Sequence, residues 1–276
     1  DYSNYIIKKL LESGLFKNVS VEIKNNKYII SVIEFPSIDK FIFNENKRLK
    51  DEDLLNIANE LNINTLSPYK IENYLNEVKN IYQSFGYNNI TINYSEQIDD
   101  NQNSAELTFD FDEGEITKIK KVYFLGNENF DNETLFTIVK SKNRTLQNIF
   151  VNNNFKLFQI ENDLLKLNKF YNNRGYRDAL VSFEVEYLED NKVEIYFNIK
   201  EGEKYYITDF SYNIGISNLD TKIENDIAEY IEDKNNNENI YSKENIEKYE
   251  LGLADILTKY GISFFEIKTQ EKIENN

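Results

Sequence analysis

The sequence predicts an α+β fold built as a tandem array of small modules, each with the element order β-α-α-β-β. One strand–corner–strand string recurs along the chain: FDEGEITKIKKVYFLGN at 111–127, FNIKEGEKYYITDF at 197–210 and the degenerate SVIEFPSIDKFIFNEN at 31–46. A glycine also recurs between a helical pattern and the strand pattern that follows it, at Gly14, Gly86, Gly175 and Gly261. Four such corners in phase with the other elements indicate an internal repeat.

The composition narrows the classes of function. A formal charge of −16 repels phosphate backbones and anionic lipid, so we predict no nucleic-acid partner. The chain lacks histidine, the usual acid–base group and metal ligand, and lacks cysteine for disulfides or thiolate sites. No apolar run approaches the roughly 20 residues of a membrane-spanning helix. Because methionine is also absent, we expect a segment or a processed product.

Residues 1–36 are predicted to be the C-terminal part of a first module. A short helical stretch ends at Ser13-Gly14, where glycine can adopt a left-handed C-cap. Apolar and polar residues then alternate on both sides of an Asn25-Asn26 turn, as in a β-hairpin. Pro36 closes this part, because proline cannot donate a ladder hydrogen bond and suits a strand edge or a joint.

Residues 37–114 are predicted to be a complete second module. A strand at 38–43 precedes a helix at 51–61, and Ser67-Pro68 supplies the N-cap and the first-turn proline of a second helix. This second helix carries one apolar stripe, made of Ile71, Leu75, Val78, Tyr82 and Phe85. After Gly86, alternating patterns at 90–94 and 107–111 predict the two strands of a hairpin.

Residues 115–203 repeat this order as a third module. A strand at 119–125 and a helix capped by Asp131 lead to a second helix, and then to a hairpin at 179–188 and 193–199. The apolar stripe of that second helix is Ile160, Leu164, Leu167 and Tyr171.

Residues 204–276 are predicted to be the N-terminal part of a fourth module, with strands at 206–212 and from 262 to 267. Its helices are expected after Asp220, reaching Ile231, and after Ser242.

These residues resemble the POTRA domains, the periplasmic repeats of the outer-membrane insertase superfamily. The resemblance rests on the element order, the Gly126-Asn127 turn after a first strand, the glycine corners and the Glu-Gly-Glu joints. Within the superfamily, FNENKRLKDEDL at 43–54 is similar to the second repeat of the BamA family, particularly its alphaproteobacterial form. The stretches at 116–130 and 170–178 resemble the third repeat. Glu45 departs from the pattern because it replaces the glycine of the Gly-Asn turn, so we expect that turn to be reshaped.

The resemblance implies that the protein binds partners by strand addition. In a three-stranded β-α-α-β-β sheet the last strand is expected in the middle, which leaves the second strand as an edge with free N–H and C=O groups. In the third module the predicted partner-binding residues are Leu180, Val181, Ser182, Phe183, Glu184 and Val185. An alternative is an ordinary sheet edge, protected by the charges of Glu184 and Glu186.

The module joints supply the other residues of interest. We predict hinge or turn roles for Pro36, Gly114, Gly202, Gly126 and Asn127. The carboxylates beside the joint glycines could be imagined as catalytic pairs, but we interpret them as solvated charges that set joint geometry; they are Glu113, Glu115, Glu201 and Glu203. Asp99, Asn101, Asn103 and Asp110 match a calcium-loop spacing only faintly, because the glycine that such a loop needs is missing, and a hairpin turn is favoured.

The resulting functional hypothesis is a non-enzymatic periplasmic scaffold without a metal or cofactor. The resemblance implies that its partners are unfolded outer-membrane proteins, accessory assembly lipoproteins and a membrane β-barrel encoded downstream in the same chain. A translocation or two-partner secretion transporter with the same repeats is one alternative. A carboxylate-dependent hydrolase is another, and it would require two acids in one cleft.

Overall fold

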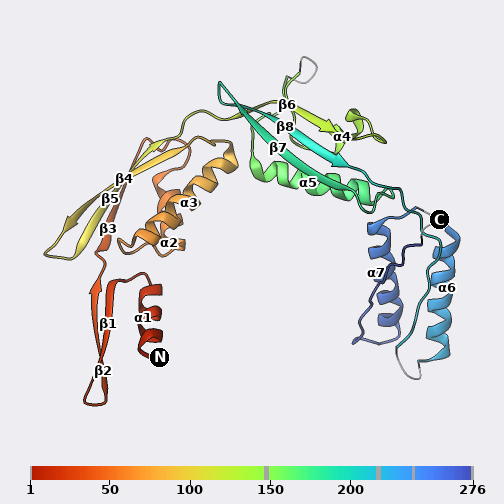
Figure 1. Ribbon diagram of the computed structural model, residues 1–276, viewed down its shortest axis with the longest axis horizontal. Helices are drawn as coiled ribbons and strands as arrows, with labels where there is room; N and C mark the ends of the chain where they lie inside the picture. Colours follow the sequence, from red (N-terminus) through yellow and green to blue (C-terminus); the bar gives the residue numbers. More distant parts are fainter. Residues whose placement is uncertain (1, 146–148, 216–218, 238–239, 275–276) are drawn as a thin grey trace. The chain divides into compact units, whose positions relative to one another are not determined.

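The computed structural model describes residues 2–145, 149–215, 219–237 and 240–274. It divides into two compact units. The first comprises residues 1–120, 144–158 and 187–193, and the second comprises residues 121–143, 159–186 and 194–276. Helices lie against small sheets in an α+β arrangement, as the sequence predicts (Figure 1).

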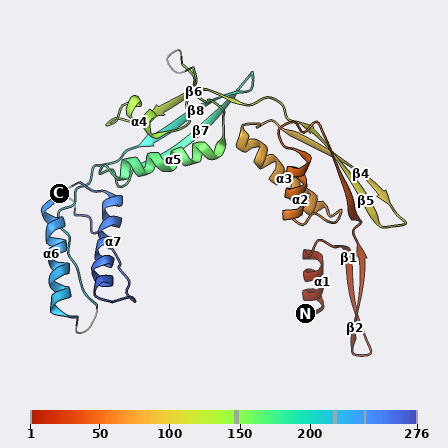
Figure 2. The same cartoon turned by 180° about the vertical axis from the view of Figure 1, so that it is seen from behind.

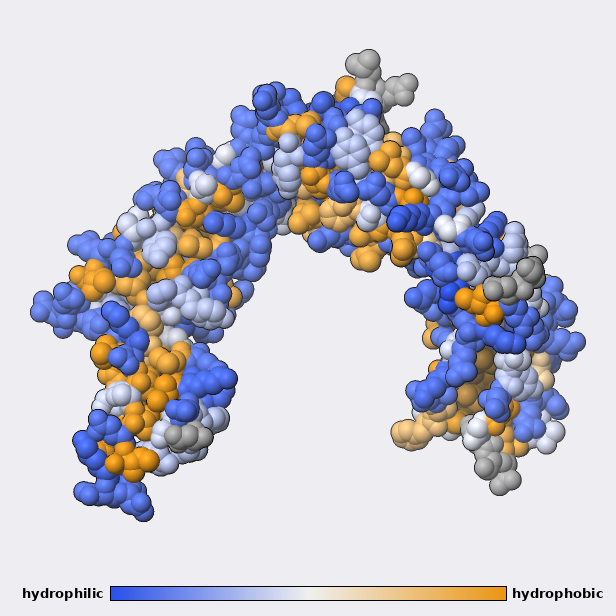
Figure 3. Space-filling model, viewed as in Figure 1, coloured by the Kyte–Doolittle hydropathy of each residue, from blue (hydrophilic) through white to orange (hydrophobic). Residues whose placement is uncertain are grey.

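The first unit begins with a helix and a hairpin. Helix α1 (Tyr2–Glu12) precedes strands β1 (Phe16–Lys24) and β2 (Lys27–Glu34), which pair antiparallel. Asn25 and Asn26 have positive φ angles of 50° and 61°, and so form the predicted tight turn. Apolar side chains gather on the surface of this hairpin (Figure 3), and those exposed on β2 are Tyr28, Ile29, Ile30, Val32 and Ile33.

The second module forms a mixed sheet covered by two helices. Its elements are β3 (Ser37–Asn44), α2 (Asp51–Glu60), α3 (Pro68–Phe85), β4 (Thr91–Asp99) and β5 (Ser104–Asp112). The strand order is β3-β5-β4, with β5 parallel to β3 and antiparallel to β4. The last strand is therefore in the middle, as expected, and β4 is an edge.

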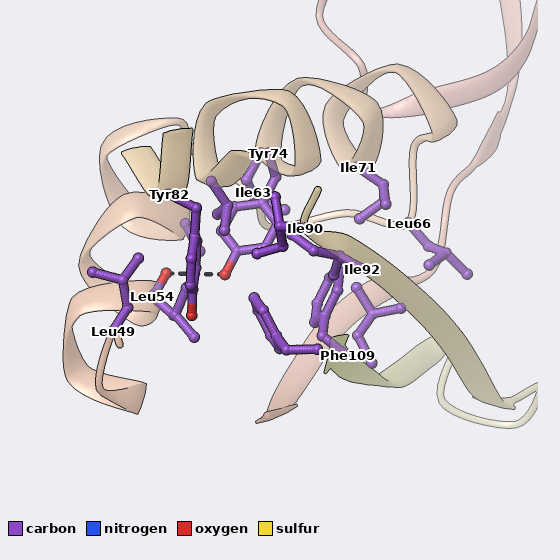
Figure 4. Close-up of a cluster of buried hydrophobic side chains, with 14 of the residues drawn as sticks. Leu49, Leu54, Ile63, Leu66, Ile71, Tyr74, Tyr82, Ile90, Ile92 and Phe109 are labelled. Atoms are coloured by element: carbon purple, nitrogen blue, oxygen red, sulfur yellow. Dashed lines mark hydrogen bonds between the residues drawn. The ribbon is translucent and has the colours of Figure 1, made fainter. Parts of the chain in front are cut away.

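One hydrophobic core joins the helices of the second module to its sheet (Figure 4). Tyr74 of α3 is fully buried, and its hydroxyl donates a hydrogen bond to the carbonyl of Leu54 in α2 at 3.2 Å. In the predicted stripe of α3, Leu75 and Phe85 are half-buried and the other members are buried. The four- and three-residue spacing therefore found the core-facing side of α3 but missed Tyr74.

The third module repeats the arrangement. It contains β6 (Lys118–Leu125), α4 (Asn132–Ile138), α5 (Leu157–Asn172), β7 (Leu180–Leu188) and β8 (Lys192–Lys200), with the strand order β6-β8-β7. The side chain of Asp131 accepts a hydrogen bond from the Thr134 N–H at 2.8 Å, which confirms the predicted N-cap. Helix α5 lies along one face of this sheet in both views (Figures 1 and 2).

The last part of the second unit is a pair of helices, α6 (Thr221–Asn237) and α7 (Lys243–Lys259), which lie side by side. Helix α6 extends beyond the predicted end at Ile231. The strands predicted at 206–212 and from 262 to 267 are wrong, since the described residues there form only one isolated bridge, between Tyr206 and Ile240. In the second and third modules these two strands pair through a middle strand, and the described part of residues 204–276 contains no such strand.

The glycine corners all have the predicted backbone conformation. Gly14, Gly86, Gly175 and Gly261 have φ angles of +67°, +102°, +98° and +77°. This left-handed region strains any other residue but costs glycine little. The sequence therefore located the ends of all four of these helices from one residue type.

Each module also begins with a short bridge that the sequence did not predict. The main-chain N–H of Leu66 donates to the carbonyl of Pro36 at 2.8 Å, and Phe155 donates in the same way to Thr117 at 2.8 Å. Tyr241 donates to Tyr205 at 3.1 Å. In the second and third modules these bonds fix the segment before the second helix against the start of the first strand. The bond of Tyr241 joins a residue shortly before α7 to one that follows β8.

Two of the residues whose carbonyls accept these bonds, Thr117 and Tyr205, also donate their own N–H to the preceding glycine corner. The N–H of Thr117 donates to the carbonyl of Gly86 at 2.9 Å, and the N–H of Tyr205 donates to the carbonyl of Gly175 at 2.8 Å. Hydrogen bonds thus cross the predicted joints on either side of the third module, inside the first and second unit respectively.

Candidate partner-binding site

Strand β7 is an edge of its sheet, because β8 is its only neighbour in the order β6-β8-β7. Along β7 the side chains alternate: Val181, Phe183 and Val185 are half-buried, whereas Leu180, Ser182 and Glu184 are exposed. This alternation places the first three on the core-facing side of the strand. The structure therefore brings all six predicted residues onto one edge strand.

The hydrogen bonds of β7 show which way its main chain points. The N–H of Val181 donates to the side-chain carbonyl of Asn168 in α5 at 3.2 Å, away from β8. In an antiparallel pair, N–H and C=O of one residue point to the same side, and this side alternates along the strand. The main-chain groups of Phe183 and Val185 consequently also point outward. Within the described part of the chain, no hydrogen bond outside the strand pairing occupies either N–H.

One of the two acidic residues on β7, Glu186, is held away from this outward row. Glu186 lies across the exposed face of the sheet, where it accepts a hydrogen bond from the Tyr196 hydroxyl of β8 at 3.0 Å. This hydrogen bond is the main cause that raises the pKa of Tyr196 above its ordinary value. Because the Glu186 carboxylate is held over the sheet face, it does not cover the edge. Glu186 is therefore a weak candidate for protecting the sheet edge from a partner strand. Glu184 is exposed on the same strand.

The interpretation of Glu201 as a solvated charge is wrong. Glu201 is only 6% exposed. It accepts hydrogen bonds from the Tyr171 hydroxyl at 3.0 Å and from the N–H of Asn129 at 3.1 Å, and from the Asn129 side chain. The carboxyl group therefore connects α5 to the turn that follows β6, and its burial is tolerated because hydrogen-bond donors surround it.

Glu113 has the same role in the second module, where it is half-buried. It accepts from the Tyr82 hydroxyl at 2.8 Å and from the N–H of Arg48 at 2.7 Å. Burial and then this type of hydrogen bond raise the pKa of both Tyr82 and Tyr171. Glu115 and Glu203 are exposed, as expected. Glu113 and Glu201 thus each bind residues of their own module.

The predicted hinge residues lie at the joints and at one turn. Gly114 and Gly202 are exposed with φ angles of +63° and +71°, and Pro36 is half-buried. Their role as hinges stays a prediction. Gly126 has φ of +82°, and a side chain there would meet the Ile199 carbonyl oxygen at 2.2 Å, so this turn requires glycine.

The turn at Glu45 is not reshaped, contrary to expectation. Glu45 has φ of +62° and so keeps the left-handed conformation of Gly126. The following asparagines also match: Asn46 donates to Asp51 at 2.8 Å, and Asn127 donates to Asn132 at 2.9 Å. The side-chain amide of the asparagine thus makes the same hydrogen bond in both turns, after glutamate in one and after glycine in the other.

The weak calcium-loop match forms a hairpin turn. Asp99 accepts hydrogen bonds from the N–H groups of Asn101 at 2.8 Å and Gln102 at 3.3 Å, as in an Asx turn. Asn103 has a left-handed φ of 47°. Asp110 lies in β5 and accepts from Asn44 instead. The four residues therefore do not gather around one point.

The buried acid Asp163 was not predicted from the sequence. Asp163 in α5 is fully buried and accepts hydrogen bonds from the N–H groups of Lys140 at 2.9 Å and Ser141 at 2.7 Å. Lys166 pairs with it at 3.1 Å. Its position three residues after Ile160, inside the apolar stripe, was the available signal. Asp163 fixes the start of the long connection between α4 and α5.

The comparison with family models agrees with this geometry. The model described as "POTRA: Surface antigen variable number repeat" matches residues 36–114 and 117–202. The chain belongs to the POTRA family. The recognition made from the sequence is therefore confirmed, and the tandem β-α-α-β-β sheets are POTRA folds. Among the described residues, no helix is both long and apolar enough to cross a membrane.

Known proteins match this chain over part of their length. The chain is 27% identical over 213 residues to the outer membrane protein assembly factor BamA of Buchnera aphidicola, covering 75% of this chain and 34% of that protein. It is 22% identical over 281 residues to BamA of Nitratidesulfovibrio vulgaris, covering 99% of this chain and 35% of that protein. The chain thus spans about a third of the length of these relatives.

A solved structure of BamA POTRA domains also matches this chain. The crystal structure of Haemophilus influenzae BamA POTRA3-5 is 16% identical, with a TM-score of 0.43, and the match covers 82% of this chain and 86% of that one.

Proposed function

We propose that this chain is the POTRA region of a BamA-like protein and serves as a periplasmic scaffold in outer-membrane protein assembly. In this proposal residues 1–36 belong to a first POTRA repeat and residues 204–276 to a fourth. The chain does no covalent chemistry. It binds unfolded β-barrel precursors in extended form, and it also docks accessory assembly proteins.

The observation that carries this proposal is the free edge of β7. The outward main-chain groups of Phe183 and Val185 can accept another strand through backbone hydrogen bonds. Such bonds read the backbone and tolerate many side chains, which suits the binding of many different precursors. The assignment to outer-membrane protein assembly is supported by the relatives, which are named as outer membrane protein assembly factors.

The edge β4 of the second repeat is the second surface in this proposal. It lies outside β5 in the order β3-β5-β4, and it exposes Tyr94 and Ile98, each 44% accessible. Two edges on separate repeats allow a precursor and an accessory protein to be bound at once. Each edge needs only an extended segment of the partner.

The experiment is an amide NMR titration of the ¹⁵N-labelled 276-residue chain with peptides from the C-terminal strands of outer-membrane barrels. The amide signals of Phe183 and Val185 are expected to shift most, with smaller shifts at Leu180, Ser182 and Glu184, whose main-chain groups point toward β8. Shifts confined to surfaces outside β7 and β4, or none at millimolar peptide, would overturn the proposal.

A further inference from the structure

We propose that Asn168 sets the register of the strand that β7 accepts, by keeping the Val181 N–H out of the new ladder. The inference rests on the proposed function, since it concerns how the same edge is used. In this arrangement the first N–H that β7 offers to an added strand is that of Phe183. Asn168 is thus a positioning residue for the partner's backbone.

The Asn168 side chain is held in the orientation that this role needs. Its amide nitrogen donates to the carbonyl of Leu164, four residues earlier in α5, at 3.1 Å. The amide oxygen therefore faces the strand and accepts from the Val181 N–H at 3.2 Å. Both residues are half-buried, so water competes only partly for this bond.

The bond removes one donor from an otherwise repeating row. On an edge strand every second residue offers an N–H and a C=O to an incoming strand. With the Val181 N–H occupied, a partner carbonyl opposite it would lose its hydrogen bond and would meet the Asn168 side chain. A partner strand that continues past this point is therefore disfavoured, and β7 selects segments that end or turn away opposite Val181.

The second repeat has no side-chain acceptor at the position that corresponds to Asn168. The matching Gly86 and Gly175 corners align Tyr82 with Tyr171, Lys79 with Asn168 and Ile92 with Val181. Lysine has no hydrogen-bond acceptor, so Lys79 cannot occupy the Ile92 N–H. By this comparison β4 offers one more outward donor at its start than β7 does. The two edges therefore differ in the length of strand that they accept.

The first test needs no partner. The variants are Asn168→Ala, which removes the acceptor, and Asn168→Asp, which loses the bond to Leu164 but presents an oxygen acceptor in either orientation of its carboxylate. Exchange of the Val181 amide with solvent deuterium is measured by NMR. It is expected to accelerate roughly tenfold in Asn168→Ala, as for loss of one hydrogen bond, and to stay within about twofold in Asn168→Asp. Lys79→Ala is the matched control and should leave the Ile92 amide unchanged.

The second test adds the barrel-strand peptide. In Asn168→Ala the peptide should bind about 2- to 10-fold more tightly than to the unaltered chain, and the Val181 amide should join those that shift. In Asn168→Asp the affinity and the set of shifted amides should match the unaltered chain.

The outcomes separate the register role of Asn168 from the proposed function. Equal exchange of the Val181 amide in Asn168→Ala and the unaltered chain would overturn the inference, because the bond would then not protect this donor. Peptide binding at Phe183 and Val185 that is identical in all variants would also overturn it, while the proposed function would stand. Absence of peptide binding to every variant would remove the proposed function and the register role together, even if the exchange test succeeded.

Discussion

The hydroxyl of Thr65 donates a hydrogen bond to the main-chain carbonyl of Gly14 at 2.8 Å. At the next two joints the equivalent glycine carbonyl accepts from a main-chain N–H, that of Thr117 or Tyr205. Pro36 occupies the corresponding position at the first joint and has no N–H to donate. The side chain of Thr65 thus replaces the donor that proline removes, and the glycine corner is bound at all three joints.

Removing this hydroxyl should weaken the contact between the first corner and the second repeat. In Thr65→Val the Gly14 carbonyl loses its donor at a site where Thr65 is only 7% exposed, which should cost about 1–3 kcal/mol. Hydrogen exchange of the amides in β1 and α1 measures the loss. Thr65→Ser keeps a hydroxyl and should behave like the unaltered chain within about 0.5 kcal/mol. Equal protection in both variants would show that the hydroxyl is not the donor that matters.

The left-handed turns of the second and third repeats should respond to substitution in opposite ways. Glu45→Gly should stabilise the second repeat by about 0.5–1 kcal/mol, because φ of +62° strains glutamate but not glycine. Gly126→Ala should destabilise the third repeat by about 2–4 kcal/mol, because the new methyl group would meet the Ile199 carbonyl oxygen. Urea denaturation provides both values. A destabilising Glu45→Gly would contradict the assignment of strain.

The buried acids should matter far more than the exposed acids beside the same glycines. Glu201→Ala leaves the Tyr171 hydroxyl and the Asn129 N–H without their acceptor, and should cost about 3 kcal/mol of unfolding free energy. The matched control Glu203→Ala, two residues away and exposed, should cost less than about 0.5 kcal/mol. Urea denaturation of the two variants tests this. Similar losses in both would return Glu201 to the class of solvated joint charges.

Alkaline pH should unfold the repeats through their buried tyrosines. Burial is the largest cause that raises the pKa of Tyr74, Tyr82 and Tyr171 above the value of about 10 expected in the unfolded chain. The stability from these groups is fully present below pH 10 and is lost as pH rises above it, because the unfolded chain then loses protons that the folded chain retains. Phenolate absorbance and circular dichroism, followed together, should show these three tyrosines ionising only with unfolding. Their ionisation in a chain that stays folded would contradict this.

The sequence predicted what depends on neighbours along the chain. Spacing located α3 and α5, a cap residue located the start of α4, and the glycine corners located four helix ends, since each is a local rule. The edge position of β7 also followed, because element order limits how three strands can be arranged. Domain boundaries drawn from these patterns stay predictions.

What the sequence missed depends on residues far apart. Glu201 and Tyr171 are 30 positions apart, and nothing in the Glu-Gly-Glu string distinguishes the buried Glu201 from the exposed Glu203. The bond between Asn168 and Val181 crosses from a helix to a strand, so neither residue type alone indicates it. The strands predicted in the fourth module failed for a related reason, because a strand needs a partner as well as an alternating pattern.

The most direct test of strand addition at β7 uses N-methylated partner peptides, which leave the protein unaltered. In an added strand, alternate amides point toward β7 and the others point away. Two versions of one barrel-strand peptide are made, each methylated at one alternate set of amides, and their affinities for the 276-residue chain are measured. One version should lose at least about tenfold in affinity, and the other should bind within about twofold of the parent peptide. Equal affinities for the two versions would contradict recognition through the backbone edge of β7.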